Sequence, residues 1–429
     1  MYYNFICVAA LVILINPFKA HLSGRFVAAF TLLSAIIFSL SAARNGFSRG
    51  FGSIYIFVNT DLSANTAQGV TAFCFLLLSI YCSFSYRNLL ATSWEVSKAI
   101  RIPDTFILTM ITCVTLSGCY LLAQLGIANL MSYDGYGSIK DLNERFEFNE
   151  LGKVIGGTFR PIALVLIAST IVSARSRRWY LQLLAAVPIS IAFMMSIAEA
   201  SRITSVYLIV AAVSFYVIDR KKVAAACALI SLIFVGYALE ARAHPTLGLS
   251  YVYQYITLSF SNPDLLEMIV TNLAASLLVT SASAKAAVPE AYDVYYKFVS
   301  FAPSFGFIDG FQSLKLANEQ RIAEYIPFNA FGEAWVFGPF YYTYLWIVIF
   351  FSASAVNSSL RIGRVAFVTL LGAFVIGLMF ASQYPIRNSV RYFYGLILLR
   401  YVLGRFFRST YGKGFQVEKF DAKSSGQLK

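Results

Sequence analysis

The chain has 429 residues, of which 58% are hydrophobic and only 13% are charged, and its formal net charge is +13. These values exclude an ordinary soluble domain, in which about 25% of residues are charged. Apolar stretches close to the ~20 residues that a helix needs to cross a bilayer recur along the whole chain. Because lipid cannot satisfy free backbone groups, each stretch is expected to be a helix. The predicted fold class is therefore an all-α polytopic membrane protein.

The first apolar stretch lacks a basic start and a small-residue cleavage site, so we interpret it as a retained span and not as a signal peptide. Eleven transmembrane helices (within a range of 10–12) are predicted in chain order, at residues 4–18, 26–43, 69–86, 105–125, 155–174, 179–198, 203–219, 222–239, 332–354, 364–382 and 390–407. We expect a single integral membrane domain over residues 1–429, with longer polar connections at 126–154 and 240–330 and a short tail at 409–429.

Lysine and arginine residues gather in alternate connections, which the positive-inside rule assigns to the cytoplasm. This assignment puts the tail inside the cell and makes both long connections extracytoplasmic, including the large loop at 240–330. A moderately apolar stretch at 265–284 is a candidate twelfth span. We favour a loop-buried or interfacial helix there, because the stretch is rich in Ala, Ser and Thr and because a crossing would break the charge alternation.

Several arginines do not belong to the cytoplasmic set. They fall at the predicted outer ends of spans or in the large outer loop: Arg160, Arg202, Arg242, Arg321, Arg387 and Arg391. Positive charge at outer ends opposes the insertion bias, and a guanidinium stays charged and binds phosphate bidentately. These residues are therefore predicted to bind an anionic substrate or a lipid phosphate.

Each arginine also has a purely structural interpretation. Glu199 and Arg202, at i and i+3, could neutralise each other at a helix end. Arg387 and Arg391 could extend to lipid headgroups, and Arg160, which precedes a proline, could bond freed carbonyl groups. That four outer-end arginines are all incidental is the less attractive hypothesis.

No metal or cofactor is expected, because the outer connections contain no D-x-D motif and no His/Cys cluster. The six cysteines lie in apolar segments, as small buried residues do. A P-loop and a G-x-G-x-x-G motif are missing from the sequence, which disfavours a cytoplasmic sugar-nucleotide donor. The net charge reflects cytoplasmic anchoring and implies no nucleic acid.

One segment carries a recognisable motif. "FNAFGEAWVFGPFYYTYLWIVIF" contains Gly332, Glu333 and Gly338 and resembles the G-E-x-Y-x-N-F-G-x-x-G entry to a late span of bacterial oligosaccharide repeat-unit polymerases, the Wzy-type O-antigen and capsule polymerases. Trp335 and Val336 fit that motif less closely.

Two further segments are similar to the same family. "EASRITSVYLIV", with Arg202, resembles the arginine-bearing start of a mid-chain span, and "RNSVRYFYGLIL", with Arg387 and Arg391, resembles the closing arginine-bearing span. The number of spans and the large outer loop in the second half also fit.

The resemblance implies a GT-C-like glycosyltransferase in the bacterial inner membrane. It would transfer the growing chain from undecaprenyl diphosphate to the next lipid-linked oligosaccharide repeat unit at the extracytoplasmic face, beside a flippase and a chain-length regulator as possible partners. An O-antigen ligase stays an alternative. A lipid-linked oligosaccharide flippase is another, although a transporter should carry charge at mid-depth and show two similar halves.

Chemical roles follow for the candidate residues. Arg202 would stabilise the charge that develops on the lipid diphosphate. The acceptor hydroxyl needs a proton acceptor, and Glu199, Glu333 and His244 are the candidates. The remaining outer arginines are predicted to bind substrate: Arg160, Arg242, Arg321, Arg387 and Arg391.

Overall fold

The structure is a computed structural model. It describes residues 2–15, 22–43, 62–84, 104–134, 149–173, 179–241, 244, 246–263, 277, 279–280, 294–302, 321–323 and 326–411. This part of the chain is almost entirely helical, at 91%. Seven of its helices are long and apolar enough to cross a membrane. The prediction of an all-α polytopic membrane protein is confirmed at this level.

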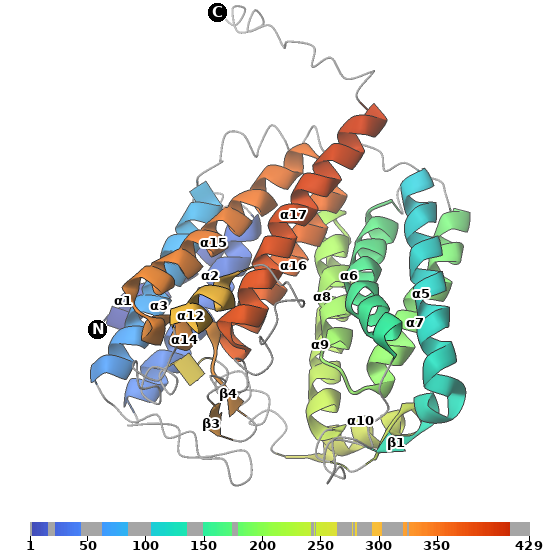
Figure 1. Ribbon diagram of the computed structural model, residues 1–429, viewed down its shortest axis with the longest axis horizontal. Coiled ribbons are helices and arrows are strands. Elements are labelled where there is room, and N and C mark those ends of the chain that lie inside the picture. Colours follow the sequence, from blue (N-terminus) through green and yellow to red (C-terminus); the bar gives the residue numbers. More distant parts are fainter. Residues whose placement is uncertain are drawn as a thin grey trace, which may run out of the picture.

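The helices of the first half are α1 (Tyr2–Ile15), α2 (Leu22–Ala43), α3 (Leu62–Phe84), α5 (Asp104–Met131), α6 (Glu150–Ser173), α7 (Trp179–Ala198), α8 (Ile203–Val217) and α9 (Lys221–Ala241). The second half contains α10 (Val252–Ser261), α12 (Val294–Phe301), α14 (Ala330–Phe337), α15 (Pro339–Ser358), α16 (Arg364–Gln383) and α17 (Ile386–Tyr411). Short 3-10 turns precede α10 and follow α15. Figure 1 shows the longer helices side by side in one bundle.

Each of the eleven predicted spans overlaps a helix, but several boundaries differ. The segment 332–354 is divided at Gly338, whose φ of 112° ends α14 and starts α15. α5 continues beyond residue 125 to Met131, across the non-helical Gly126. α17 runs to Tyr411 and so includes the first residues of the predicted tail. Most of the possible twelfth span at 265–284 lies outside the described residues.

The two ends of the bundle differ in character. β1 (Tyr133–Asp134) pairs with β2 (Thr246–Leu247) in an antiparallel sheet, which joins the two long connections. β3 (Arg321–Ala323) pairs with β4 (Ile326–Pro327), and these strands and α10 lie at the lower end in Figure 1. We call this the loop end. The C-terminal end of α17 lies at the opposite end, which we call the basic end because it also carries Arg220 to Lys222 and Arg361.

α16 is the central helix of the structure. It packs against α6, α8, α15 and α17, and its side chains Phe367 and Phe374 are fully buried. A second aromatic core joins α3 to the late helices, where the Phe75 ring contacts the rings of Phe331 and Trp346 edge-on. Such packing fixes the helix ends that carry the polar residues at the loop end.

Candidate functional site

The corner between α16 and α17 is the centre of the candidate site. α16 ends at Gln383 and α17 begins at Ile386, directly after Pro385, which has no N–H to lose at a helix start. This corner lies at the loop end and places Arg387 and Arg391 in the first two turns of α17. Both residues were predicted from the sequence to bind substrate.

The turn between α7 and α8 brings two more predicted residues to this end. Ala200 has a φ of 47°, in the left-handed region, and its side chain is fully buried. This conformation turns the chain sharply, so that Glu199 and Arg202 lie beside the neighbouring helices. The Arg202 guanidinium donates a hydrogen bond of 2.9 Å to the Gln383 Oε1 atom. The turn is thereby attached to the end of α16.

Arg160 lies two positions before the apolar part of α6, which covers Ile162–Val172. Its guanidinium forms an ion pair with the Glu199 carboxylate. The side chains are 44% and 29% exposed, so the pair is accessible from outside the bundle and is not enclosed by the core. The α7–α8 turn therefore has two polar contacts at the loop end, one with α6 through Glu199 and one with the end of α16 through Arg202.

Glu333 occupies a different environment from Glu199. Only 4% of its surface is exposed, and its Oε2 atom accepts a 2.7 Å hydrogen bond from the Ile386 N–H. The carboxylate thus caps the first turn of α17, where a negative charge is favourable. This contact points to a structural task, although Glu333 was predicted as a proton acceptor.

Arg387 and Arg391 lie at positions i and i+4 of α17 and so project from one face of the helix. α12 packs against this helix. The Nε atom of Arg391 is buried and has no hydrogen-bond partner in the described part of the chain. A buried guanidinium nitrogen of this kind is costly until an acceptor reaches it.

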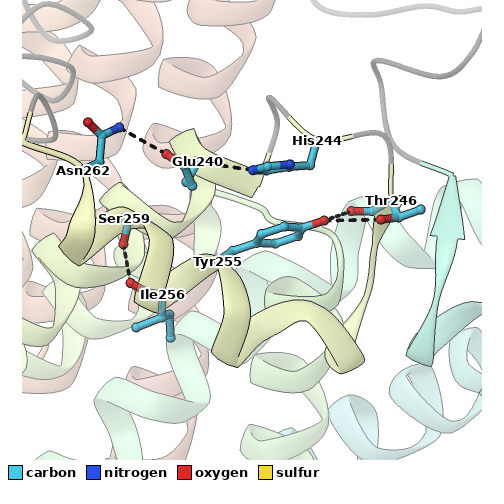
Figure 2. A network of polar contacts seen from close by, with 7 residues as sticks. All are labelled: Glu240, His244, Thr246, Tyr255, Ile256, Ser259 and Asn262. Atoms are coloured by element: carbon cyan, nitrogen blue, oxygen red, sulfur yellow. Dashed lines mark hydrogen bonds and ion pairs between the residues drawn. The ribbon is translucent and has the colours of Figure 1, made fainter.

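His244 belongs to a separate polar network at the loop end (Figure 2). Its ring stacks on Tyr255 at a centroid distance of 4.6 Å, and its Nε2 atom lies 3.4 Å from Glu240 Oε1. Tyr255 donates a 2.6 Å hydrogen bond to the Thr246 carbonyl, while Asn262 donates to the second oxygen of Glu240. The network connects the end of α9 to β2 and α10.

The predicted residues therefore form two groups. Arg202 contacts the end of α16, and Glu199 on the same turn pairs with Arg160, whereas His244 stands in its own network. A buried apolar cluster that includes Ala200, Tyr237 and Tyr255 connects the two groups. Arg242 lies outside the described residues, and Arg321 is described only as the first residue of β3.

Sequence reasoning missed Gln383, Asn329 and Glu240. Asn329 directly precedes α14 and has the signature of a helix N-cap, which a search for caps could have found. The i, i+4 spacing of Glu240 and His244 is a local signal that could have found Glu240. No local signal marks Gln383, because its partner Arg202 is 181 positions away in sequence.

Within the described residues no group of three or more His, Cys, Asp or Glu side chains is arranged to hold a metal ion. Comparison with protein-family models, curated proteins and solved structures finds no match for this chain. Functional inference therefore depends on the geometry of the site and on the short motifs in the sequence.

Proposed function

We propose that this protein is a membrane glycosyltransferase of the bacterial inner membrane that polymerises oligosaccharide repeat units linked to undecaprenyl diphosphate. One observation carries the proposal. Arg160, Glu199 and Arg202 are linked to the α16–α17 corner, where Arg387 and Arg391 begin α17, at the end opposite to the basic connections. The positive-inside rule assigns that end to the extracytoplasmic face.

The proposed reaction uses this arrangement of charges. The bond between the anomeric carbon of the donor chain and its phosphate oxygen breaks, and the acceptor hydroxyl oxygen bonds to that carbon. The lipid diphosphate leaves with the electron pair, and arginines already in position stabilise its charge without reorganisation. Glu199, which is partly exposed, takes the hydroxyl proton.

Arg202 and the arginine pair of α17 have different tasks in the proposed reaction. Arg202 is held by a neutral amide at the end of α16, while Arg387 and Arg391 can bind two phosphate oxygens from one face of α17. Bidentate binding orients the diphosphate relative to Glu199, and orientation alone can contribute several kcal/mol to a transfer reaction. No metal is required in this proposal, since guanidinium groups supply the positive charge.

A deletion strain distinguishes the proposal from the two alternatives. Loss of a polymerase leaves single lipid-linked repeat units at the outer face of the membrane, and no long polysaccharide. Loss of a ligase leaves long chains that are still attached to lipid, and loss of a flippase leaves single units at the cytoplasmic face. The measurement is mass spectrometry of extracted lipids, with a membrane-impermeant glycosidase to report the face.

Complementation of the deletion strain then tests whether Arg202 is required for polymerisation. A plasmid copy of the unmodified gene should restore the ladder of long polysaccharide chains on a gel. A copy that carries Arg202→Ala should not, at equal protein level in the membrane. Accumulation of lipid-linked polymer in the deletion strain would refute the polymerase assignment in favour of a ligase.

A further inference from the structure

α14 is a short helix at the loop end that packs against α15, α16 and α17 (Figure 1). It has eight residues, and Glu333 is its only charged one. Asn329, just before the helix, is fully buried, and Glu333 is almost so. Two buried polar side chains on an apolar element are costly unless each has good partners. Their partners therefore reveal what α14 does.

Asn329 contacts two elements at once. Its Oδ1 atom accepts a 2.8 Å hydrogen bond from the Gly332 N–H and so caps α14. Its Nδ2 atom donates to the Ser382 carbonyl oxygen at 3.3 Å and to Thr280 Oγ1 at 2.7 Å. Ser382 is the penultimate residue of α16, so Asn329 holds the end of that helix.

Glu333 holds the other side of the same corner. Its hydrogen bond goes to the N–H of Ile386, the first residue of α17. Ile386 is fully buried, so water cannot replace the carboxylate there. Asn329 and Glu333 therefore contact Ser382 and Ile386, which lie on the two sides of the corner.

We infer that Asn329 and Glu333 are positioning residues, and that together they set the α16–α17 corner from which Gln383 and Arg387 extend. This inference rests on the proposed function and gives Glu333 a task other than proton transfer. Glu333 acts through the backbone of α17, and Asn329 acts through the carbonyl end of α16. A small displacement of this corner moves the arginines relative to Arg202, which the neighbouring Gln383 holds.

The decisive measurement does not depend on activity. A nitroxide label on Asn388→Cys, an exposed position in the first turn of α17, reports the mobility of that turn in a variant without native cysteines. Glu333→Ala is expected to increase the mobility that the electron paramagnetic resonance spectrum reports for this label. Glu333→Gln keeps an oxygen acceptor and should leave the spectrum unchanged. Glu240→Ala removes another partly buried carboxylate at the same end and is the matched control, without effect on the label.

Two further variants keep the test informative if Glu333→Ala does not accumulate in the membrane. Glu333→Asp preserves the charge but withdraws the carboxylate from Ile386, and Asn329→Asp preserves the α14 cap but cannot donate to Ser382. Both should mobilise the label. A spectrum unchanged from that of the labelled parent in these variants would overturn the inference.

Polymerisation provides the second readout. Glu333→Gln should retain the polysaccharide ladder, and Glu333→Asp and Asn329→Asp should lose most of it. Loss of the ladder in Glu333→Gln, with the label spectrum unchanged, would show that the charge of Glu333 acts in the chemistry and would reject the positioning role. If the label responds as expected but even the unmodified chain makes no polymer, the positioning role stands and the proposed function fails.

Discussion

The Arg202 guanidinium donates a 2.9 Å hydrogen bond to Gln383 Oε1, across a sequence separation of 181 residues. The contact joins the start of α8 to the end of α16 at the loop end. An amide orients the guanidinium without adding negative charge beside it. This contact fixes where the positive charge of Arg202 lies at the loop end.

Replacement of this amide by a carboxylate should inhibit the protein. We expect Gln383→Glu to lower polymerisation by about 10²-fold, the effect of removing one transition-state donor, because the new carboxylate competes with the lipid diphosphate for Arg202. Gln383→Leu, which removes the hydrogen bond but adds no charge, is the control and should be less severe. The polysaccharide ladder on a gel measures both. Equal ladders from Gln383→Glu and the unmodified chain would contradict the role of Arg202.

The ion pair between Arg160 and Glu199 can be tested by exchange of its charges. Arg160→Glu combined with Glu199→Arg should give a protein level in the membrane at least equal to that of either single variant, because the pair re-forms between α6 and the α7–α8 turn. Polymerisation should stay lost, since the carboxylate is then on the wrong side of the acceptor. Quantitative blotting and the ladder give the two readings. Recovery of the ladder by the double variant would show that the pair is only structural.

The fold was largely predictable, because hydropathy over a 20-residue window depends only on local sequence. The break at Gly338 leaves no mark in the hydropathy, but the Gly338–Pro339 pair is a local signal of a helix break. For the site, the sequence predicted which residues are involved but not which of them contact each other. Charge in an apolar context identified Arg160 and Glu199, but their pairing requires knowledge of how α6 and α7 pack.

Glu333 also shows that sequence alone does not identify the partner of a polar residue. Its motif and its acidic character predicted an outer-face proton acceptor. The packing of α14 against α17 instead buries the carboxylate on the Ile386 N–H, a contact between residues 53 positions apart in sequence. A sequence pattern identifies a polar residue at a helix end, whereas its partner is decided by tertiary structure.

His244 should contribute to stability and not to the chemistry. Its ring stacks on Tyr255 within a network that closes the α9–α10 connection (Figure 2). We expect His244→Ala to lower the free energy of unfolding by about 1 kcal/mol, the typical value of an aromatic pair, and to preserve the ladder. His244→Phe should retain the stack and most of the stability. Thermal unfolding in detergent gives the first value, and loss of polymer in both variants would instead indicate a catalytic histidine.

The orientation of the bundle can be measured with single cysteines in a background without the six native ones. Ser261, at the end of α10, and Lys222, at the start of α9, are exposed at opposite ends of the structure. We expect a membrane-impermeant maleimide to label Ser261→Cys in intact cells, and to label Lys222→Cys only after permeabilisation, because basic connections stay in the cytoplasm. The reverse pattern would place the candidate site inside the cell and exclude the proposed function.

The arginine pair of α17 gives the sharpest test of phosphate binding. Arg387 and Arg391 lie on one face of the helix, and a lysine at either position keeps the charge but loses the planar fork. We expect Arg387→Lys and Arg391→Lys to lower polymerisation by about 10²-fold, nearly as much as alanine, at unchanged membrane level. Arg400, on the same helix but near the basic end, donates to Ser358 Oγ and supplies the matched control. Arg400→Lys should give a normal ladder, because a lysine ammonium can also donate to a hydroxyl. If the two outer variants also give normal ladders, these arginines only contact lipid headgroups, and the diphosphate must bind elsewhere.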